Sequence, residues 1–346
     1  MSRTALIIGG TGQIGLPVVQ SLLAKGWDIR VAARGRRALP AHLARCGVRP
    51  VMLDRDSPGA LASALGGGVD ALIDVTAYDP SHGRQLIEVQ GDVGALVVIS
   101  SSSVYRDDAG RTLDEAARNG FPELPEPISE AQPTVAPGDE TYSTRKVALE
   151  HLLLDEATIP VTILRPAAIH GPGSIHPREW WFVKRMLDGR PVIPLAYEGR
   201  SRFHTSSALN IAALVAVVLD NPATRILNIA DPAAPSVAEI GAAIAEHMAY
   251  RGRFVALAGD EFPARIGRTP WSVPRPFVLD TKAAAALGYS PAIATYRRSV
   301  GPICDDLVDR GRSGDWRTAF PILAAYPHEL FDYEREDALL VGHPSL

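Results

Sequence analysis

The amino-acid sequence predicts an α/β protein with a doubly wound parallel sheet and a smaller, mixed C-terminal lobe that binds substrate. Two observations lead to this prediction. In the first half of the 346-residue chain, short and continuously apolar runs alternate with amphipathic stretches. This alternation is typical of βαβ units in a buried parallel sheet. Beyond residue 166, strand-like runs become fewer and loops rich in proline and glycine take their place.

The expected strands are recognised because each is short, apolar throughout and rich in branched side chains. Along the chain they are TALIIGG, WDIRVAA, VRPVMLD, VDALIDV, GALVVIS and PVTILRP. Amphipathic runs predict helices at 13–25, 36–45, 57–66, 81–91 and about 139–157, the last with Asp139 as its N-cap, and then at 177–189, 207–219, 235–249 and in DTKAAAALG. We therefore expect a dinucleotide-binding domain over residues 1–170 and a substrate-binding lobe over 171–346. The run ILNIA, near residues 226–230, is expected to return to the first domain's sheet.

The composition excludes several classes of protein. A net charge of −4, with arginines dispersed along the chain, argues against a nucleic-acid partner. Cys46 and Cys304 are too few for a zinc site or a disulfide framework, and we expect no metal. The longest apolar stretch, 208–219, is too short to span a bilayer, and Arg3 leads directly into the first strand without a signal peptide. We expect a soluble, cytoplasmic protein with no membrane partner.

Three glycines follow the first strand, in the sequence IIGGTGQIG. Gly9, Gly12 and Gly15 leave a predicted strand and open a predicted helix. In that position the missing side chains let backbone N–H groups approach a pyrophosphate, and the helix N-terminus favours its negative charge. The spacing therefore predicts a dinucleotide-binding turn of the Rossmann kind. The alternative is a glycine-rich turn with no ligand.

The ends of the second and third strands bear on the choice of nucleotide. A site that selects the free ribose 2′-hydroxyl usually has an acidic residue about 20 residues after the glycines, and this chain has Arg34 there. A guanidinium suits a 2′-phosphate, so we expect NADP, with NAD as second choice. Arg34 stacked on adenine or facing solvent is the alternative. Asp54 is placed either to contact the adenine or to cap a helix.

The sequence YSTRK places Tyr142 four residues before Lys146. On a helix these residues share a face, so the ammonium can favour the phenolate and lower the phenol's pKa toward neutrality. The run ISSSSVY ends the fifth strand, where a parallel sheet places its ligand cleft. A serine there can donate a hydrogen bond to a carbonyl or alkoxide oxygen. Together these groups point to hydride exchange between a carbinol or carbonyl carbon and a nicotinamide.

The motifs GGTGQIG, SSSSVY, YSTRK and LRPAAIHGPG resemble those of the extended short-chain dehydrogenase/reductases, the NAD(P)-dependent epimerase/dehydratase group. The resemblance implies that Ser101 is the catalytic serine, Tyr142 the acid/base, and Lys146 a ligand of the cofactor ribose. We also expect substrate contacts from Ser102, His170, Arg202 and His204. A solvated surface arginine is the alternative for Arg202, and a structural histidine is the alternative for His204. The cofactor-binding residues expected in addition to Lys146 are Gly9, Thr11, Gly12, Gln13, Ile14, Gly15, Arg34, Asp54, Thr76 and Pro166.

Departures from the family's motifs narrow the chemistry. Family dehydratases carry an Asp-Glu pair after the catalytic Ser/Thr, where this chain has Ser102 and Ser103. We therefore disfavour dehydratase chemistry and, because Ser103 replaces a Glu, decarboxylase chemistry. A nicotinamide-dependent epimerase or reductase is expected, with a nucleotide-sugar or another small carbonyl compound as substrate. The alternative is a non-catalytic NADP-binding sensor or RNA-associated module. The resemblance also makes a homodimer an expectation.

Overall fold

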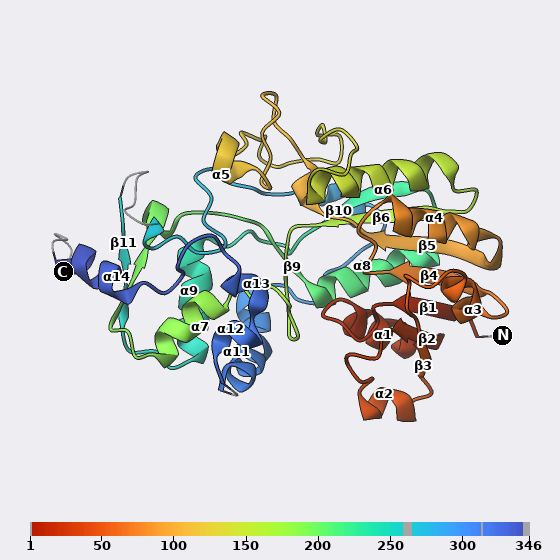
Figure 1. Cartoon of the computed structure of the whole chain (residues 1–346), viewed down its shortest axis with the longest axis horizontal. Coiled ribbons are helices and arrows are strands. Elements are labelled where there is room, and N and C mark those ends of the chain that lie inside the picture. The colour runs from red at the N-terminus through yellow and green to blue at the C-terminus, as the bar shows by residue number, and fades with distance from the viewer. Residues whose placement is uncertain (1, 259–264, 313, 342–346) are drawn as a thin grey trace. The chain divides into compact units, whose positions relative to one another are not determined.

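The computed structural model describes residues 2–258, 265–312 and 314–341, and the chain divides into two compact units (Figure 1). The first unit comprises Met1–Ala167, Ala208–Ala230 and Leu279–Ala292. The second comprises Ala168–Ser207, Asp231–Val278 and Ile293–Leu346. The first unit thus extends beyond the expected domain of residues 1–170: besides the ILNIA strand, it includes a helix before that strand and a short segment near residue 285.

A seven-stranded parallel sheet forms the centre of the first unit, and the predicted fold class is confirmed. The strand order is β10-β6-β5-β4-β1-β2-β3. The strands are β1 (Thr4–Ile8), β2 (Asp28–Ala33), β3 (Arg49–Met52), β4 (Val69–Asp74), β5 (Val93–Ile99), β6 (Val161–Pro166) and β10 (Arg225–Ile229). The order reverses direction between β1 and β4. In doubly wound sheets the ligand binds at such a switch point, outside the carboxyl ends of the strands.

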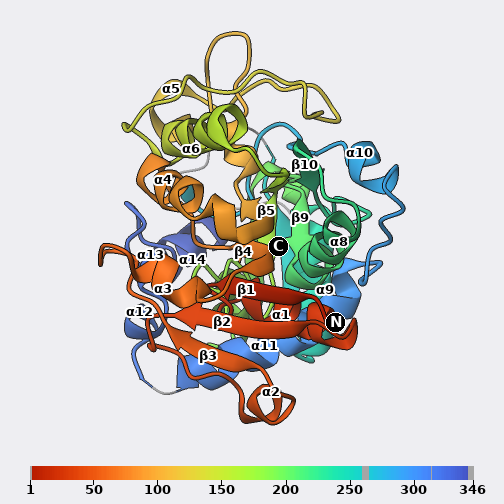
Figure 2. The same ribbon diagram turned by 90° about the vertical axis from the view of Figure 1, so that its right-hand side faces the viewer.

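Helices cover both faces of this sheet (Figure 2). On one face, α3 (Ala60–Leu65), α4 (Pro80–Glu88) and α6 (Tyr142–Glu156) bury leucines against every second residue of the strands. On the other face, α1 (Gly15–Ala24) packs against α8 (Ala208–Asp220). Shorter elements complete the unit: α2 (Ala41–Arg45), α5 (Ala116–Asn119), α10 (Lys282–Ala285), and the 3₁₀ turns η1 (Gln90–Asp92) and η2 (Ser102–Val104).

Helix α6 begins three residues later than the sequence predicts. Its N-cap is Thr141, whose side chain accepts a hydrogen bond from the Thr144 N–H at 3.1 Å, while Thr144 Oγ1 accepts one from the Thr141 N–H at 2.9 Å. The prediction of Asp139 as the N-cap is therefore wrong. The reciprocal Thr141–Thr144 pair satisfies two N–H groups at the start of the helix. As a consequence, Tyr142 is the first residue of the helix.

The second unit is mainly helical and has its own core. Its helices are α7 (Trp180–Leu187), α9 (Val237–His247), α11 (Tyr296–Arg312), α12 (Trp316–Ala319), α13 (Pro321–Ala324) and α14 (Tyr333–Val341), and its 3₁₀ turn is η3 (Ala196–Gly199). Two short parallel pairs join β7 (Ala168–His170) to β9 (Thr205–Ser207) and β8 (Val192–Leu195) to β11 (Arg253–Ala256). Buried aromatic and aliphatic side chains from α7, α9 and α11 form one cluster.

Candidate functional site

The glycine turn after β1 has no room for a side chain at Gly9 or at Gly15. A Cβ on Gly15 would lie 2.3 Å from the Gly9 carbonyl oxygen and 2.5 Å from Gly10 Cα. Gly9 has a φ of +81°, which glycine adopts without strain, and a Cβ there would lie 2.5 Å from Thr76 Cγ2. The Gly12 N–H donates to the Gly9 carbonyl at 2.9 Å. The turn therefore packs closely against Thr76, just after β4, and against Gly15, the first residue of α1.

The N-terminus of α1 suits an anion. Within the described residues, no side chain caps this terminus and its first turn carries no acidic residue. The helix dipole and the close backbone of the glycine turn therefore favour a negative group at this point. Thr11, Gln13 and Ile14, which the sequence predicts as cofactor ligands, lie half-buried in the same turn. The turn thus fits the pyrophosphate of a dinucleotide.

The carboxyl ends of β2, β3 and β4 carry three further predicted residues. Arg34 is exposed just after β2, and Asp54, just after β3, accepts a hydrogen bond from the Asp56 N–H at 3.3 Å. The Asp54 carboxylate therefore makes a contact within its own turn. Thr76 follows β4 and donates to Asp74 Oδ1 from both its N–H, at 2.8 Å, and its Oγ1, at 3.1 Å.

Lys146 lies at the carboxyl ends of β4 and β5, on the inner face of α6. Only 3% of its surface is exposed, and its ammonium donates to the carbonyl oxygens of Ala77 and, at 2.9 Å, of Ile99. Burial lowers the pKa of Lys146 to about 8, and the nearby carboxylates of Asp74 and Glu150 oppose a further fall. The two carbonyls fix the ammonium at the end of the sheet and occupy two of its three hydrogens.

Tyr142 lies one helical turn before Lys146, as the spacing predicts. The ammonium is 5.6 Å from the centre of the Tyr142 ring, and 36% of the tyrosine's surface is exposed. Burial of the hydroxyl and the neighbouring Tyr78 raise the pKa of the Tyr142 phenol well above its usual value, while a hydrogen bond with Ser101 acts in the opposite direction. The direction of this pKa shift is opposite to the one that the Tyr-Lys spacing predicts. The phenol is therefore protonated in the free protein.

Ser101 follows β5 and caps the short turn η2. Its Oγ accepts a hydrogen bond from the Ser103 N–H at 3.1 Å and lies 2.9 Å from Ser103 Oγ. Ser101, Tyr142 and Lys146 thus gather at the carboxyl ends of β4 and β5, as the sequence predicts. Pro166, at the end of the adjacent strand β6, is buried. We refer to Ser101, Tyr142, Lys146 and the glycine turn as the candidate site.

Tyr78 and Asp74 belong to the surroundings of the candidate site and were not predicted from the sequence. The Tyr78 ring packs edge-on against Tyr142, with their centres 6.4 Å apart, and lies 5.1 Å from the Lys146 ammonium. Asp74 is fully buried and forms an ion pair with Arg55 at 2.6 Å. A carboxylate as the last residue of a buried strand is an unusual position, and it is the one signal in the sequence that could have identified Asp74.

The residues predicted to contact substrate differ in their surroundings. Ser102 is buried in η2. In the second unit, His170 Nε2 lies 2.6 Å from Asp231 Oδ2, and His204 Nε2 lies 2.8 Å from the Asp231 carbonyl oxygen. Both histidines are at most 4% exposed, so within this unit they organise the segment around Asp231. Burial alone would raise the pKa of the Asp231 carboxyl. The hydrogen bond from His170 and its charge outweigh burial and lower this pKa to about 2.

Arg202, the remaining residue predicted to contact substrate, is half-buried. Its Nε donates to the carbonyl oxygen of Ala234 at 3.4 Å.

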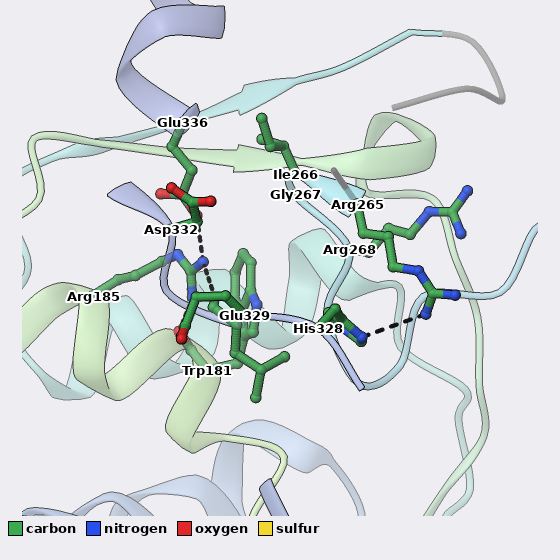
Figure 3. Close-up of a pocket in the computed structure, with 11 residues that line it drawn as sticks. Trp181, Arg185, Arg265, Ile266, Gly267, Arg268, His328, Glu329, Asp332 and Glu336 are labelled. Carbon is green, nitrogen blue, oxygen red and sulfur yellow. Dashed lines mark hydrogen bonds and ion pairs between the residues drawn. The ribbon is translucent and has the colours of Figure 1, made fainter. Parts of the chain in front are cut away.

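A separate small cavity lies inside the second unit (Figure 3). Its volume of about 10 Å³ has room for a single water. Arg185 and Glu336 line it and form a buried ion pair, and within the described part of the chain Arg185 Nε and Glu336 Oε2 have no protein partner. A water in this cavity would serve these two atoms. The cavity is too small for a substrate.

Two further features of the described residues concern metal ligands and membrane-spanning helices. Among the described residues, no group of His, Cys, Asp or Glu side chains is arranged to hold a metal ion. In the same part of the chain, every helix is too short or too polar to cross a bilayer.

The chain is similar to curated enzymes over part of its length. It is 28% identical to the 2′-dehydrokanamycin reductase of Streptomyces kanamyceticus over 229 residues, which are 64% of this chain and 59% of that protein. The chain spans less than two thirds of the length of the curated relatives it matches.

Solved structures share the fold over nearly the whole chain. The Bordetella bronchiseptica enzyme WbmH, solved with NAD⁺, superimposes with a TM-score of 0.68 at 15% identity, covering 90% of this chain and 100% of that one. The UDP-glucose 4-epimerase of Thermotoga maritima, solved with UDP-glucose, gives a TM-score of 0.65 at 15% identity and covers 88% and 99%.

A family model covers more than half of the chain, from the first strand of the sheet to the last. It matches residues 5–230, the span that holds the glycine turn, Ser101, Tyr142 and Lys146. The chain therefore belongs to the NAD dependent epimerase/dehydratase family.

Proposed function

We propose that this protein transfers a hydride between the nicotinamide of a bound NAD(P) and a carbinol or carbonyl carbon, with Tyr142 as the acid/base. The observation that supports this most strongly is the meeting of three groups at the ends of β4 and β5: the Tyr142 phenol, the Ser101 hydroxyl and the Lys146 ammonium. The glycine turn, which suits a pyrophosphate, lies at the end of the adjacent strand β1.

The raised pKa of Tyr142 favours the reductive direction. A protonated phenol can donate its proton to a carbonyl oxygen as the carbon receives hydride, whereas removing a proton from a carbinol requires the phenolate. Ser101 would donate a hydrogen bond to the same oxygen and support the negative charge that develops there. The Lys146 ammonium, with one hydrogen left after its two carbonyl contacts, would bind the cofactor ribose and stabilise the phenolate that remains. The bound nicotinamide supplies the hydride in this direction.

For the cofactor we propose NADP. Arg34 is exposed at the carboxyl end of β2, the strand next to the glycine turn, where its guanidinium could bind a 2′-phosphate. Thr76, Asp54 and Pro166 would line the rest of the nucleotide site. Fluorescence titration with NADPH and NADH tests this assignment, since equal affinities for the two would remove Arg34 from the site.

The substrate we propose is a small ketone or aldehyde, which includes oxidised sugars. The curated relative described above is named as a reductase, and a relative in fold was solved with UDP-glucose. Dehydratase chemistry is disfavoured, because Ser102 and Ser103 follow Ser101 directly and neither can act as a carboxylic acid or base. A panel of ketones and keto-sugars, followed by NADPH absorbance, separates a reductase, which consumes the cofactor, from an epimerase, which does not.

Removing the Tyr142 hydroxyl tests the proposal directly. We expect Tyr142→Phe to lower kcat by about 100-fold or more, because a general acid contributes about 10²–10⁴-fold. Its affinity for NADPH, measured by fluorescence, and its melting temperature should match those of the wild type. Tyr250→Phe, which removes a phenol hydroxyl in the second unit, is the matched control and should keep wild-type kcat. Full turnover by Tyr142→Phe would exclude Tyr142 as the acid/base.

A further inference from the structure

Hydroxyl groups form a continuous row behind the candidate site. Ser101 Oγ lies 2.9 Å from Ser103 Oγ, and Ser103 Oγ lies 2.9 Å from Ser143 Oγ. Ser143 Oγ in turn lies 2.7 Å from a carboxylate oxygen of Asp114. Each distance is that of an ordinary O–H···O hydrogen bond. The row therefore joins the serine beside Tyr142 to a carboxylate in the segment 107–139.

The two ends of this row differ in their access to water. Ser101, at the inner end, is half-buried, and Ser143 is fully buried, whereas Asp114, at the outer end, is exposed. At the inner end, the Ser103 N–H fixes the position of Ser101 Oγ at 3.1 Å. At the outer end, the Ser143 N–H donates to Asp114 at 2.9 Å. The row is thus held at both ends and is open to solvent at the carboxylate.

The hydrogens of the row can all point the same way. An ionised carboxylate and a carbonyl oxygen only accept, so the single hydrogen of the Ser143 hydroxyl goes to Asp114 at 2.7 Å or to the Ser103 carbonyl oxygen at 2.9 Å, and not to Ser103 Oγ. In the free protein, Ser103 is then left to donate to Ser143, and Ser101 to donate to Ser103, which leaves a lone pair of Ser101 Oγ for the Tyr142 hydroxyl. When a substrate carbonyl is bound, the Ser101 hydrogen turns to the substrate oxygen, as proposed above. Hydroxyl groups can rotate. Once a proton enters at Asp114, all the hydrogen bonds of the row can therefore reverse, so that each group donates toward Tyr142.

We propose that Asp114, Ser143 and Ser103 form a proton path that reprotonates Tyr142 through Ser101. The proposal rests on the proposed reduction, in which the phenol gives its proton to the substrate oxygen and the hydride from the reduced nicotinamide bonds to the carbon. A proton from water or buffer enters at the ionised Asp114 carboxylate. The Tyr142 phenolate takes the Ser101 proton, Ser101 takes that of Ser103, Ser103 that of Ser143, and Ser143 takes the proton that entered at Asp114, which leaves the carboxylate ionised again. One proton thus enters for each hydride transferred.

This path serves a reductase better than an epimerase. A reduction takes up one proton from solvent in each turnover, whereas an epimerase returns its proton to the substrate and needs none. Substrate that contacts the Tyr142 hydroxyl also covers the exposed face of the phenol, so water cannot reach it from that side. The row of hydroxyls reaches Tyr142 from the protein side and stays available while substrate is bound.

A structural role for Asp114 predicts a different outcome. The carboxylate anchors the segment 107–139 to the first turn of α6 through the Ser143 N–H and hydroxyl. If anchoring were its whole contribution, loss of the carboxylate would lower stability and leave proton transfer unchanged. The test therefore needs readouts that depend on proton transfer and not on packing.

The experiment measures kcat, KM and the solvent deuterium isotope effect with a carbonyl compound that the wild type reduces. Asp114→Asn and Ser103→Ala interrupt the path, and Ser103→Thr keeps a hydroxyl in the same place. We expect the first two variants to lower kcat about 10-fold or more with KM within about twofold, and to raise the isotope effect. Added imidazole should restore part of the lost kcat, and Ser103→Thr should retain most of it. Asp108→Asn, which changes an exposed carboxylate of the same segment, should behave as the wild type.

The outcomes for these variants distinguish a failure of the proton path from a failure of the proposed function. Wild-type kcat and an unchanged isotope effect in both Asp114→Asn and Ser103→Ala, with Tyr142→Phe inactive, would overturn the path and leave the function standing. A fall in melting temperature without a kinetic effect would leave Asp114 as an anchor only. Full turnover by Tyr142→Phe would contradict both the proton path and the proposed role of Tyr142 as the acid/base.

Discussion

Lys146 keeps its charge in a nearly water-free position. Its ammonium has two backbone carbonyls as partners and no direct ion pair among the described residues, so burial is the largest influence on its pKa. A buried ammonium with a pKa of about 8 is close to losing its proton under ordinary assay conditions. The charge that the proposed mechanism needs is therefore sensitive to small changes in pH.

We expect kcat/KM for reduction to fall as the pH rises through about 8. The sign follows from the direction of the pKa shift: a lowered lysine pKa means that the cation is present below about 8 and is lost above it. Tyr142, whose pKa is raised, stays protonated over the same range and does not limit the rate. A pH profile of kcat/KM, which reports the free enzyme, measures this alkaline limb.

Lys146→Arg tests the assignment of the limb, because a guanidinium keeps its charge over the whole range. This variant should lose the limb near pH 8 even if its overall rate is lower. A wild-type profile that stays flat from pH 7 to 9.5 would show that the Lys146 charge is not required.

The sequence predicted the residues that local geometry brings together and missed those that a loop brings in. Tyr142 and Lys146 are one helical turn apart, so their convergence follows from the helix itself. Asp114 lies 29 residues before Ser143, in a segment with little regular structure. No periodicity relates these two positions, so only the folded chain could reveal the contact.

At the scale of elements, the turn between β1 and α1 depends on the absence of one side chain. The Gly9 carbonyl and Gly10 Cα pass so close to Gly15 that a Cβ there would overlap backbone atoms. Backbone cannot rotate away as a flexible side chain can. The start of α1 would have to move away from the turn, and the N–H groups proposed to bind pyrophosphate would move with it.

Gly15→Ala should therefore weaken nucleotide binding by about 10-fold or more and destabilise the fold by about 1–3 kcal/mol, the usual cost of overpacking. Isothermal titration with NADPH and urea unfolding measure the two effects. Gly91→Ala is the matched control, since a Cβ at Gly91 meets no atom within 4 Å. Undiminished affinity in Gly15→Ala would mean that the start of α1 does not contact the nucleotide.

The elements of the parallel sheet were predictable, whereas those of the second unit were only partly so. Strands β1, β4, β5 and β6 are mostly apolar runs of five to seven residues, and their burial on both faces is visible in the sequence. Strands β8 and β11 are four residues each and pair with one another across about 60 positions, which no local pattern records. The long helix α11 contains Pro302, and a proline inside a sequence normally indicates that a helix ends there. The helix nevertheless continues past this proline, with one face buried through Val300, Ile303, Cys304 and Leu307.

At the scale of the whole molecule, neither unit is a single stretch of chain. The chain passes from one unit to the other at residues 167, 207, 230, 278 and 292. The sheet of the first unit takes its edge strand β10 from beyond the first segment of the second unit. In that strand, Asn228 accepts a hydrogen bond from the fully buried Tyr105 hydroxyl at 2.7 Å.

We expect a fragment of residues 1–170 to aggregate rather than fold alone. It would leave β6 as an unpaired edge, expose the side of α1 that α8 covers, and leave the Tyr105 hydroxyl without its partner. Size-exclusion chromatography and circular dichroism, with the full chain beside it, measure the outcome. A monomeric fragment that unfolds cooperatively and binds NADPH would contradict this expectation.

The place of β10 in the sheet also has a consequence for protein synthesis. A ribosome finishes β6 at Pro166, then extrudes residues 168–207 and α8, and only afterwards delivers Arg225–Ile229. During that interval β6 is an additional open edge, whose outer N–H and C=O groups have no neighbouring strand. The interval lasts as long as translation needs to cross the intervening codons, so elongation speed there sets how long neighbouring nascent chains can reach the open edge.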